Sequence, residues 1–389
     1  MRLNGTPITI LGAGIAGLAA ARALALKGAE VTVLEQAEAV TEVGAGLQVS
    51  PNGASVLRAL GLGDALDGQG LPARAVRLVD GPTGQQVIEL DLSGRGYRFI
   101  HRADLIALLL DGARQAGAQL RLLQRIETVD LSAPHPRLVT AQGAEIDCPI
   151  LIGADGLKSK VRAAVDGNTP AAFTGQVAWR ATLPADEPNP DPIAEVHVGP
   201  GRHLVSYPLR GGTLRNIVAV EERNRWVDEG WALRDDPLAM RVAFEGFSPR
   251  VQSWLERVED VHLWGLFRHP VAKSWHRGRT AILGDAAHPT LPFLAQGANM
   301  ALEDAWVLTA MLDRHDTPEA AFAAYQAARA PRCARIVEAS SRNARAYHLR
   351  SPLREIAHAG LRLSAKVAPG AALKRFDWIY KWDETGRSA

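Results

Sequence analysis

The sequence offers few residues for crosslinking and no candidate membrane anchor. Its 389 residues include only two cysteines, Cys148 and Cys333, which stand far apart and without the spacing of a metal site. We interpret both as reduced thiols of a cytoplasmic protein, because disulfides persist mainly in oxidising compartments. Apart from an N-terminal stretch that glycines interrupt, no run of about 18 apolar residues occurs, so no membrane-spanning helix is expected.

A charge excess and the common metal and hydrolase signatures are also lacking. Lysine and arginine number 44 and aspartate and glutamate 42, so the net charge is only +2 with neutral histidine. This balance gives no general electrostatic reason to bind nucleic acid or to stay on an acidic membrane. No Gly-x-Ser-x-Gly elbow occurs, and the eleven histidines form no i, i+4 pair backed by a glutamate. Neither that nucleophile nor a metal mechanism is therefore expected, and both a monomer and a homodimer stay open.

What the sequence does contain begins with a glycine-rich turn. The pattern Gly12-x-Gly14-x-x-Gly17 lies between an apolar run at 8–11 and an alanine-rich helical stretch that continues to position 27. In such a turn Gly12 permits the tight bend, Gly14 lets backbone amides approach a pyrophosphate, and Gly17 lets helix and strand pack closely. The first helical amides, at Ile15 and Ala16, then face the anion. A glycine-rich turn without a ligand is the alternative.

The next predicted strand, 30–35, ends in Glu35. A carboxylate there accepts hydrogen bonds from ribose hydroxyls and repels a 2′-phosphate. The bound nucleotide is therefore expected to be FAD or NAD and not NADP. Strand, helix and strand form a βαβ unit, which predicts a parallel sheet.

Hydrophobic periodicity predicts the other elements. Strands are expected at 75–80, 86–91, 136–141, 149–153, 194–198, 203–209, 215–221 and 279–283. Helices are expected at 51–60, 102–116, 157–165, 235–246, 298–313, 317–346 and 352–367. The section 173–270 lacks βαβ rhythm, so we predict an antiparallel sheet with a few helices there.

Two further segments pair glycine with aspartate after a strand. They are LIGADG at 151–156, followed by Ser159, Val161 and Arg162, and AILGDAAHP at 281–289. Together with the first turn, these segments resemble the fingerprints of group A flavoprotein monooxygenases, whose best-known fold is that of p-hydroxybenzoate hydroxylase. The resemblance implies FAD as cofactor, NADH or NADPH as electron donor and O2 as co-substrate. It also implies hydroxylation of a small phenolic or hydroxy-heteroaromatic acid through a flavin C4a-hydroperoxide.

The resemblance also implies cofactor-binding roles for separate residues. Asp285, after Gly284, would reach the ribityl hydroxyls; Asp155, before Gly156, would help FAD and the nicotinamide donor; and Arg102 would pair with the pyrophosphate region. Each has an alternative, because aspartates after strands often cap helices and Arg102 could form a surface ion pair. His288 is expected to be structural or adjacent to the cofactor.

The flavin ring is expected between two segments that resemble the family's. One is the start of a helix after two prolines, whose amides would stabilise the reduced flavin anion. The other is the glycine-containing stretch 44–52. The residues concerned are Pro292, Gly297, Ala298 and Asn299 in the first segment and Gly44, Gly46 and Leu47 in the second.

Candidate substrate residues lie on the strand 203–209. His203, Val205 and Tyr207 share one face of that strand, and the spacing resembles the salicylate hydroxylase, 3-hydroxybenzoate 6-hydroxylase and 6-hydroxynicotinate 3-monooxygenase branch. The branch implies His203 as base or hydrogen-bond partner and Tyr207 as an orienting group; a core histidine and a packing tyrosine are the alternative. Arg180, Gln296 and Gln48 are further candidates for contact with substrate.

Gln48 stands where nicotinate-type members carry histidine, which argues against hydroxynicotinate as substrate. A quinone precursor, a polyketide or another heterocycle stays open as substrate, as does a dehydrogenase or oxidase that binds FAD without hydroxylating.

The predicted fold class is α/β (α+β overall). A Rossmann-like FAD-binding domain, interleaved with a mainly antiparallel β-sheet substrate domain, is expected to be followed by C-terminal helices. The FAD-binding parts are 1–75, 101–172 and 271–335, the substrate parts are 76–100 and 173–270, and the C-terminal helices are 336–389.

Overall fold

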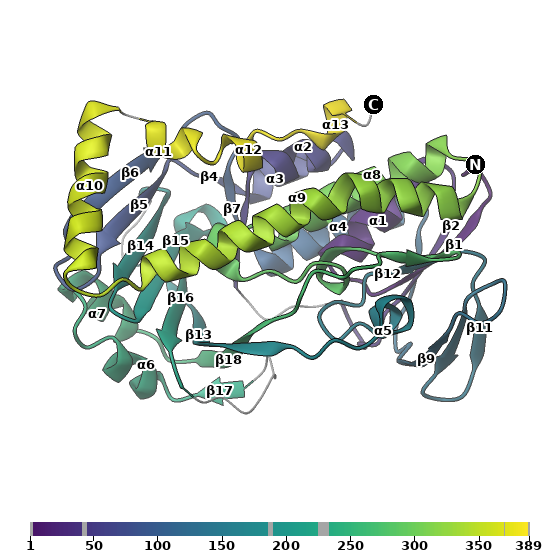
Figure 1. Cartoon of the computed structure of the whole chain (residues 1–389), viewed down its shortest axis with the longest axis horizontal. Coiled ribbons are helices and arrows are strands. Elements are labelled where there is room, and N and C mark those ends of the chain that lie inside the picture. The colour runs from purple at the N-terminus through teal and green to yellow at the C-terminus, as the bar shows by residue number, and fades with distance from the viewer. Residues whose placement is uncertain (1–2, 41–44, 186–189, 225–232, 369, 388–389) are drawn as a thin grey trace.

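Two main sheets lie side by side along the long axis of the molecule (Figure 1). The computed structural model describes residues 3–40, 45–185, 190–224, 233–368 and 370–387. The predicted α/β fold class is confirmed. The assignment of chain segments to domains stays a prediction.

The first sheet has six strands, in the order β19-β20-β12-β1-β2-β8. Their bounds are β1 Pro7–Leu11, β2 Glu30–Leu34, β8 Gln119–Arg121, β12 Leu151–Gly153, β19 His276–Arg277 and β20 Thr280–Ile282. All pairs are parallel except β19 with β20. The carboxyl ends of β1, β12 and β20 are therefore neighbours at one edge of this sheet.

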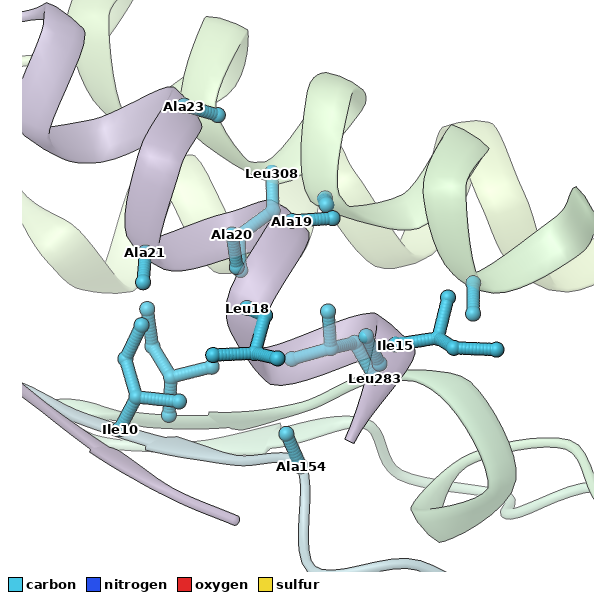
Figure 2. Close-up of a cluster of buried hydrophobic side chains, with 14 of the residues drawn as sticks. Ile10, Ile15, Leu18, Ala19, Ala20, Ala21, Ala23, Ala154, Leu283 and Leu308 are labelled. Carbon is cyan, nitrogen blue, oxygen red and sulfur yellow. The ribbon is translucent and has the colours of Figure 1, made fainter. Parts of the chain in front are cut away.

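Helix α1 (Ile15–Leu26) is the crossover between β1 and β2. Ten of its twelve residues are buried, because the sheet covers one side and α8 (Gly297–Arg314) covers another (Figure 2). Alanines at 19–21 and 23 keep the helix thin enough for both contacts, while Leu18 packs toward the sheet (Figure 2). The helix ends before Gly28, whose φ of 86° continues no right-handed helix.

The second sheet has eight strands, in the order β17-β18-β13-β16-β15-β14-β5-β6. Their bounds are β5 Ala75–Asp80, β6 Gln86–Asp91, β13 Ala172–Pro184, β14 Ile193–Gly199, β15 Arg202–Leu209, β16 Leu214–Glu222, β17 Leu233–Asp235 and β18 Val261–Arg268. Only β5 with β14 is parallel. Helices α6 (Pro237–Ala243) and α7 (Pro249–Leu255) cover one face around Trp179, Phe244 and Trp254.

The antiparallel sheet predicted for 173–270 is confirmed, but one helix prediction there is wrong in extent. The predicted helix spans 235–246, whereas α6 ends at Ala243. The chain then turns, and Pro249 begins α7, which is a position where proline costs no hydrogen bond. The long strands β13 and β18 were not predicted, because both of their faces are largely covered and their residues do not alternate clearly.

Two three-stranded sheets and the remaining helices complete the fold. The small sheets are β3 (Gly46–Val49), β7 (Arg98–His101) and β4 (Leu71–Pro72), and β9 (Ile126–Asp130), β10 (Arg137–Thr140) and β11 (Glu145–Asp147). The helices are α2 Pro51–Ala59, α3 Gly63–Gln69, α4 Arg102–Gln115, α5 Lys160–Asp166, α9 Pro318–Tyr347, α10 Leu353–Val367, α11 Ala371–Lys374, α12 Asp377–Tyr380 and α13 Glu384–Arg387. Short 3-10 turns lie at Arg210–Gly212, Gly284–Ala286 and Pro292–Leu294.

Helix α9 runs diagonally across the molecule from the first sheet to the second (Figure 1). It brings its last turn, near Tyr347, to the face of the second sheet that α6 and α7 leave open. Within the described ranges no helix combines the length and apolar character needed to cross a membrane.

Candidate active site

The three glycine-containing turns meet at the carboxyl ends of β1, β12 and β20. Gly12 has a φ of 107°, and a β-carbon there would lie 2.4 Å from the carbonyl oxygen of Ala154. Gly284 has a φ of 62°, and a β-carbon there would lie 2.8 Å from that of Ala16. Both positions accept only glycine, because a side chain would be strained and would also collide. The tertiary fold thus brings the three motifs together.

Of the three glycines in the first turn, Gly14 is the one with open space beside it, where an anion could bind. A β-carbon at Gly17 would lie 2.0 Å from the carbonyl oxygen of Gly12, so this glycine serves the packing of α1 on β1. Gly14 has no heavy atom within 4 Å of the same position. Because α1 begins at Ile15 and its first turn carries no acidic residue, the free amides and the positive helix end face this space. The turn therefore fits a pyrophosphate.

Glu35 directly follows β2 and lies beside the turn. Its carboxylate accepts a hydrogen bond from the backbone of Ala13 at 2.8 Å and one from Ala37 at 3.0 Å. These bonds fix both oxygens and leave further lone pairs available, because an ionised carboxylate accepts about four hydrogen bonds. The arrangement fits the predicted binding of ribose hydroxyls.

The structure gives Asp155 a capping role. Its carboxylate accepts hydrogen bonds from the amides of Lys160 (2.8 Å) and Val161 (3.2 Å) and from the hydroxyl of Ser159 at the start of α5. The alternative stated for this residue, a helix cap, is thus observed, and direct contact with the cofactor stays a prediction. Gly156 has a φ of 73°, and a β-carbon there would have no protein atom within 4 Å.

Asp285 is exposed to solvent, although protein lies close around its carboxyl group. Its residue is exposed, yet the surrounding protein raises the pKa of the carboxyl, and the positive charges of His288, Arg102 and His269 oppose that rise. Arg102, the first residue of α4, thus lies near Asp285 although 183 positions separate them in the chain. The charge of one residue predicted to hold the cofactor therefore acts on another.

A buried ionic cluster supports the turn that carries Asp285. Asp304 on α8 accepts hydrogen bonds from the amide of Gly284 at 3.0 Å, from Arg329 at 2.8 Å and from His288. Burial raises the pKa of Asp304, but His288 and Arg329 outweigh it and hold that pKa below its ordinary value. The structural role predicted for His288 agrees with these contacts.

The sequence did not reveal this cluster, whose members lie on α8, α9, α13 and the loop that contains His288. Arg329 also binds Glu303 and Glu384, each at 2.6 Å. His288, Asp304 and Cys333 lie close enough together to ligate a metal ion. Arg329, however, places a buried cation against the same carboxylate, so the cluster is better explained as an ion-pair network.

Asn299 and Gln296 join the two segments predicted to line the flavin ring. The Asn299 side chain accepts a hydrogen bond from the amide of Ser50 at 3.0 Å and donates one to the carbonyl of Gln48 at 3.0 Å. Gln296 donates to the hydroxyl of Ser50 at 3.0 Å and accepts from Asn52 at 3.1 Å. These bonds hold β3 against the N-terminus of α8.

The same segments contain the remaining predicted cofactor residues. Pro292 opens the 3-10 turn Pro292–Leu294, and Ala295 after it has a φ of 52° although it is not glycine. Such strain is common at binding sites. Gly297 and Ala298 begin α8, and Gly46 and Leu47 begin β3. Gly44 lies outside the described residues. The contact of Gln296 with substrate stays a prediction, since its amide is already bonded to Ser50 and Asn52.

The face of the second sheet that α6 and α7 leave uncovered lies opposite β3 and the N-terminus of α8. We call its exposed part the floor of the candidate site. Val205, Val218 and Arg180 are cross-strand neighbours on β15, β16 and β13. All three are partly exposed although they lie on central strands, whereas His203 and Tyr207 on the same face are buried. Phe293 packs on this face beside Val218. A row of partly exposed residues in the middle of a sheet indicates a cavity floor.

His203 lies at one end of this floor. Its Nδ1 lies 2.7 Å from Nε2 of His348, and its ring lies 5.1 Å from that of Tyr347 and 5.3 Å from that of Phe293. Burial lowers the pKa of His203 well below its ordinary value, and the charge that His348 can carry lowers it further. His203 is therefore neutral near pH 7 and has a lone pair available.

Tyr207 lies at the other end, against β3. A β-carbon at Gly46 would lie 2.5 Å from its ring and 2.8 Å from its hydroxyl oxygen, and its ring packs on Phe99 at 5.0 Å. Burial raises the pKa of Tyr207, and the positive charge of Arg180 opposes that rise. Arg180 also stacks over Trp264 at 4.3 Å. The hydroxyl of Tyr207 stays protonated and can donate a hydrogen bond.

Several residues of the site were not found from the sequence. His348 follows α9 and reaches His203 only through the tertiary fold, and Asn216 accepts a hydrogen bond from the amide of Gly46 at 2.7 Å. A weak signal existed for Asn216, a polar residue at the start of the predicted strand 215–221. No local signal marks His348, which lies at the end of a long polar helix.

Comparisons with known proteins agree with this geometry. Residues 5–340 match the model of a family described as FAD binding domain. A 3-hydroxybenzoate 6-hydroxylase of Klebsiella oxytoca is 33% identical over 388 residues, which cover 96% of each chain. A 3-amino-4-hydroxybenzoate 2-monooxygenase of Streptomyces cremeus is 36% identical over 360 residues, 88% of each chain. The crystal structure of Klebsiella pneumoniae HpxO with FAD and uric acid has a TM-score of 0.83 and 26% identity, covering 93% of this chain and 94% of that one.

Proposed function

The chain belongs to this FAD-binding family of flavoprotein hydroxylases, and from that premise we propose that it uses NAD(P)H and O2 to hydroxylate a small phenolic or hydroxy-heteroaromatic acid. The observation that carries the proposal is the partly exposed row Val205, Val218 and Arg180 between His203 and Tyr207. When bound, FAD would pass the electrons of NAD(P)H to O2 and so activate it. The residues of this chain position the substrate and exclude water.

The spacing along β15 supports a single aromatic ring as substrate. His203 and Tyr207 are four residues apart on one strand, so their side chains stand about 13 Å apart. A hydrogen bond of about 2.8 Å at each end leaves roughly 7 Å, which a benzene ring with two polar substituents spans. Val205, half-buried between them, offers an apolar contact to such a ring. The floor therefore favours a hydroxylated aromatic acid.

Each end of the floor has a distinct chemical role in this proposal. Neutral His203 accepts the phenolic proton, which makes the ring richer in electrons and easier to oxidise. Tyr207 donates a hydrogen bond, and Arg180 attracts the substrate carboxylate by its charge. Apolar walls from Phe293 and Tyr347 keep water from the reacting ring.

The cofactor-binding residues are assigned within the same proposal. The turn Gly12–Gly17 holds the pyrophosphate, Glu35 the adenine ribose, and Asp285 with Arg102 the ribityl and pyrophosphate region. The N-terminus of α8 faces the ring edge that becomes anionic when reduced. Asp155 supports this site through the start of α5.

The proposal is tested by screening hydroxybenzoates and hydroxypyridines for stimulated NADH and NADPH consumption, with product and H2O2 measured together. A true substrate yields hydroxylated product in proportion to the nicotinamide consumed. His203→Gln should keep FAD but lose on the order of 10²-fold in hydroxylation, with a larger share of H2O2. The matched control is His135→Gln, at an exposed position. Nicotinamide oxidation that yields only H2O2 with every compound would instead indicate an oxidase.

A further inference from the structure

A chain of three titratable groups leads from the candidate substrate floor to the protein surface. His203 Nδ1 lies 2.7 Å from His348 Nε2, and His348 Nδ1 lies 2.9 Å from a carboxylate oxygen of Glu222. The histidines are 2% and 5% exposed, whereas the Glu222 side chain is 42% exposed. The chain is thus buried at its inner end and open to solvent at its outer end.

The hydrogen-bonding capacity of these groups fixes one tautomer at each ring. The Glu222 carboxylate can only accept, so His348 carries its proton on Nδ1 and offers a lone pair on Nε2. His203 must then donate from Nδ1, which leaves its Nε2 as an acceptor. Nε2 takes no part in the bond to His348, so the ring can accept a substrate proton on one nitrogen while it donates from the other.

The surroundings favour neutral imidazoles in this chain. Burial lowers the pKa of His348, although Glu222 opposes that change. The cations Arg202 and Arg350 lie near His348 and lower its pKa as well. The side-chain amide nitrogen of Gln176 on β13 also lies 3.3 Å from His348 Nδ1, the ring nitrogen that faces Glu222. Beside His203 the neighbouring rings, those of Phe293 and Tyr347, carry no charge.

A base in this position needs an exit for its proton. His203 is fully surrounded, and an imidazolium there would be a buried charge that no carboxylate contacts directly among the described residues. Burying an unpaired charge is costly. His203 can therefore act as an efficient base only if the proton on its Nδ1 leaves as the substrate proton arrives at its Nε2.

We propose that His348 and Glu222 form a proton relay that carries the proton of the bound phenol from His203 to solvent. This inference rests on the proposed function. The phenol O–H bond breaks as a bond forms to His203 Nε2. The proton on His203 Nδ1 passes to His348 Nε2, and the proton on His348 Nδ1 passes to Glu222, which releases it to water. Each imidazole ends neutral with its tautomer reversed, one proton enters solvent, and no electron is transferred.

The relay is tested on the oxidised holoenzyme without nicotinamide, so that no turnover occurs. The enzyme is mixed with 3-hydroxybenzoate in weak buffer, and proton release is followed with phenol red in a stopped-flow instrument. The wild type should release a proton as it binds the compound. His348→Gln should bind it but release the proton on the order of 10²-fold more slowly. Added imidazole should restore the rate in His348→Ala, which a purely structural role would not allow.

A second variant keeps the test independent of folding defects in the interior. Glu222→Gln alters an exposed group and should give a release rate between those of wild type and His348→Gln. The matched control is Glu221→Gln, which removes the same charge from the next residue of β16, where Glu221 pairs with Arg202 and Arg223. This control should match the wild type.

The outcomes separate the relay from the proposed function. Wild-type proton release that stays equally fast in His348→Gln and Glu222→Gln would overturn the relay, as would 3-hydroxybenzoate-stimulated NADH oxidation without any proton release. A wild type for which no phenolic compound binds or stimulates nicotinamide oxidation would instead overturn the proposed function itself.

Discussion

Gly14 and Gly17 lie three residues apart in one turn, yet their replacement by alanine should have opposite consequences. A new methyl group at position 17 would lie 2.0 Å from the carbonyl oxygen of Gly12, which is backbone and cannot move alone. Overpacking of this kind costs about 1–3 kcal/mol or more. Gly17→Ala should therefore destabilise the apoprotein and lower its yield, whether or not FAD is present.

Gly14→Ala should leave the apoprotein intact and weaken FAD binding. No protein atom lies within 4 Å of the new methyl group, and the φ of −78° suits alanine. Loss of glycine at the N-cap costs up to about 1 kcal/mol, which the lower entropy of the unfolded chain offsets by about 0.4–1 kcal/mol. In the holoprotein the methyl group occupies the space assigned to the pyrophosphate. A clash of about 1–3 kcal/mol corresponds to roughly 5- to 150-fold weaker binding.

The assay combines thermal unfolding of the apoprotein, followed by circular dichroism, with FAD titration followed by flavin fluorescence. Gly68→Ala is the matched control, because Gly68 on α3 also has no atom within 4 Å and lies away from the turn. Wild-type FAD affinity in Gly14→Ala would refute the placement of the pyrophosphate. A large loss of apoprotein stability in the same variant would refute the claim that the space is free of protein.

Three further changes have definite expected results. Asp285→Ala should retain FAD about 10- to 150-fold less tightly, the equivalent of one lost charged hydrogen bond, and wild-type retention after gel filtration would contradict its role. Gly46→Ala drives a methyl group into the ring of Tyr207, so urea unfolding should show a loss of about 1–3 kcal/mol and the substrate KM should rise. Burial raises the pKa of Glu195, but Arg250 and a neighbouring histidine outweigh it and lower that pKa to about 2. Its stabilising contribution is therefore present above about pH 4.3 and lost as the pH falls toward 2. In Glu195→Gln the free energy of unfolding should fall less steeply over this pH range than in the wild type. An equally steep fall would exclude the ion pair of Glu195 with Arg250 as its cause.

Local sequence signals were sufficient where a requirement is local. Gly12 and Gly284 have φ values of 107° and 62°, in the left-handed region that favours glycine, so local sequence signals locate both turns. Strands at 75–80 and 86–91 were predicted with the bounds that the structure shows, because turn residues punctuate them on both sides. The predicted helix 235–246 was too long, since proline at 249 and the preceding turn divide that region.

The sequence by itself determined the nucleotide-binding turn, the order of the three glycine-containing motifs and the face of β15 that carries His203 and Tyr207. These features depend on backbone geometry and on the period of a strand, which nearby residues set. Only the tertiary structure decided that Asp304 supports the turn of Gly284, and that His348 lies against His203, 145 positions away in the chain. Such partners come together when α8 and α9 pack across both sheets, and no local pattern encodes which buried polar groups then face one another.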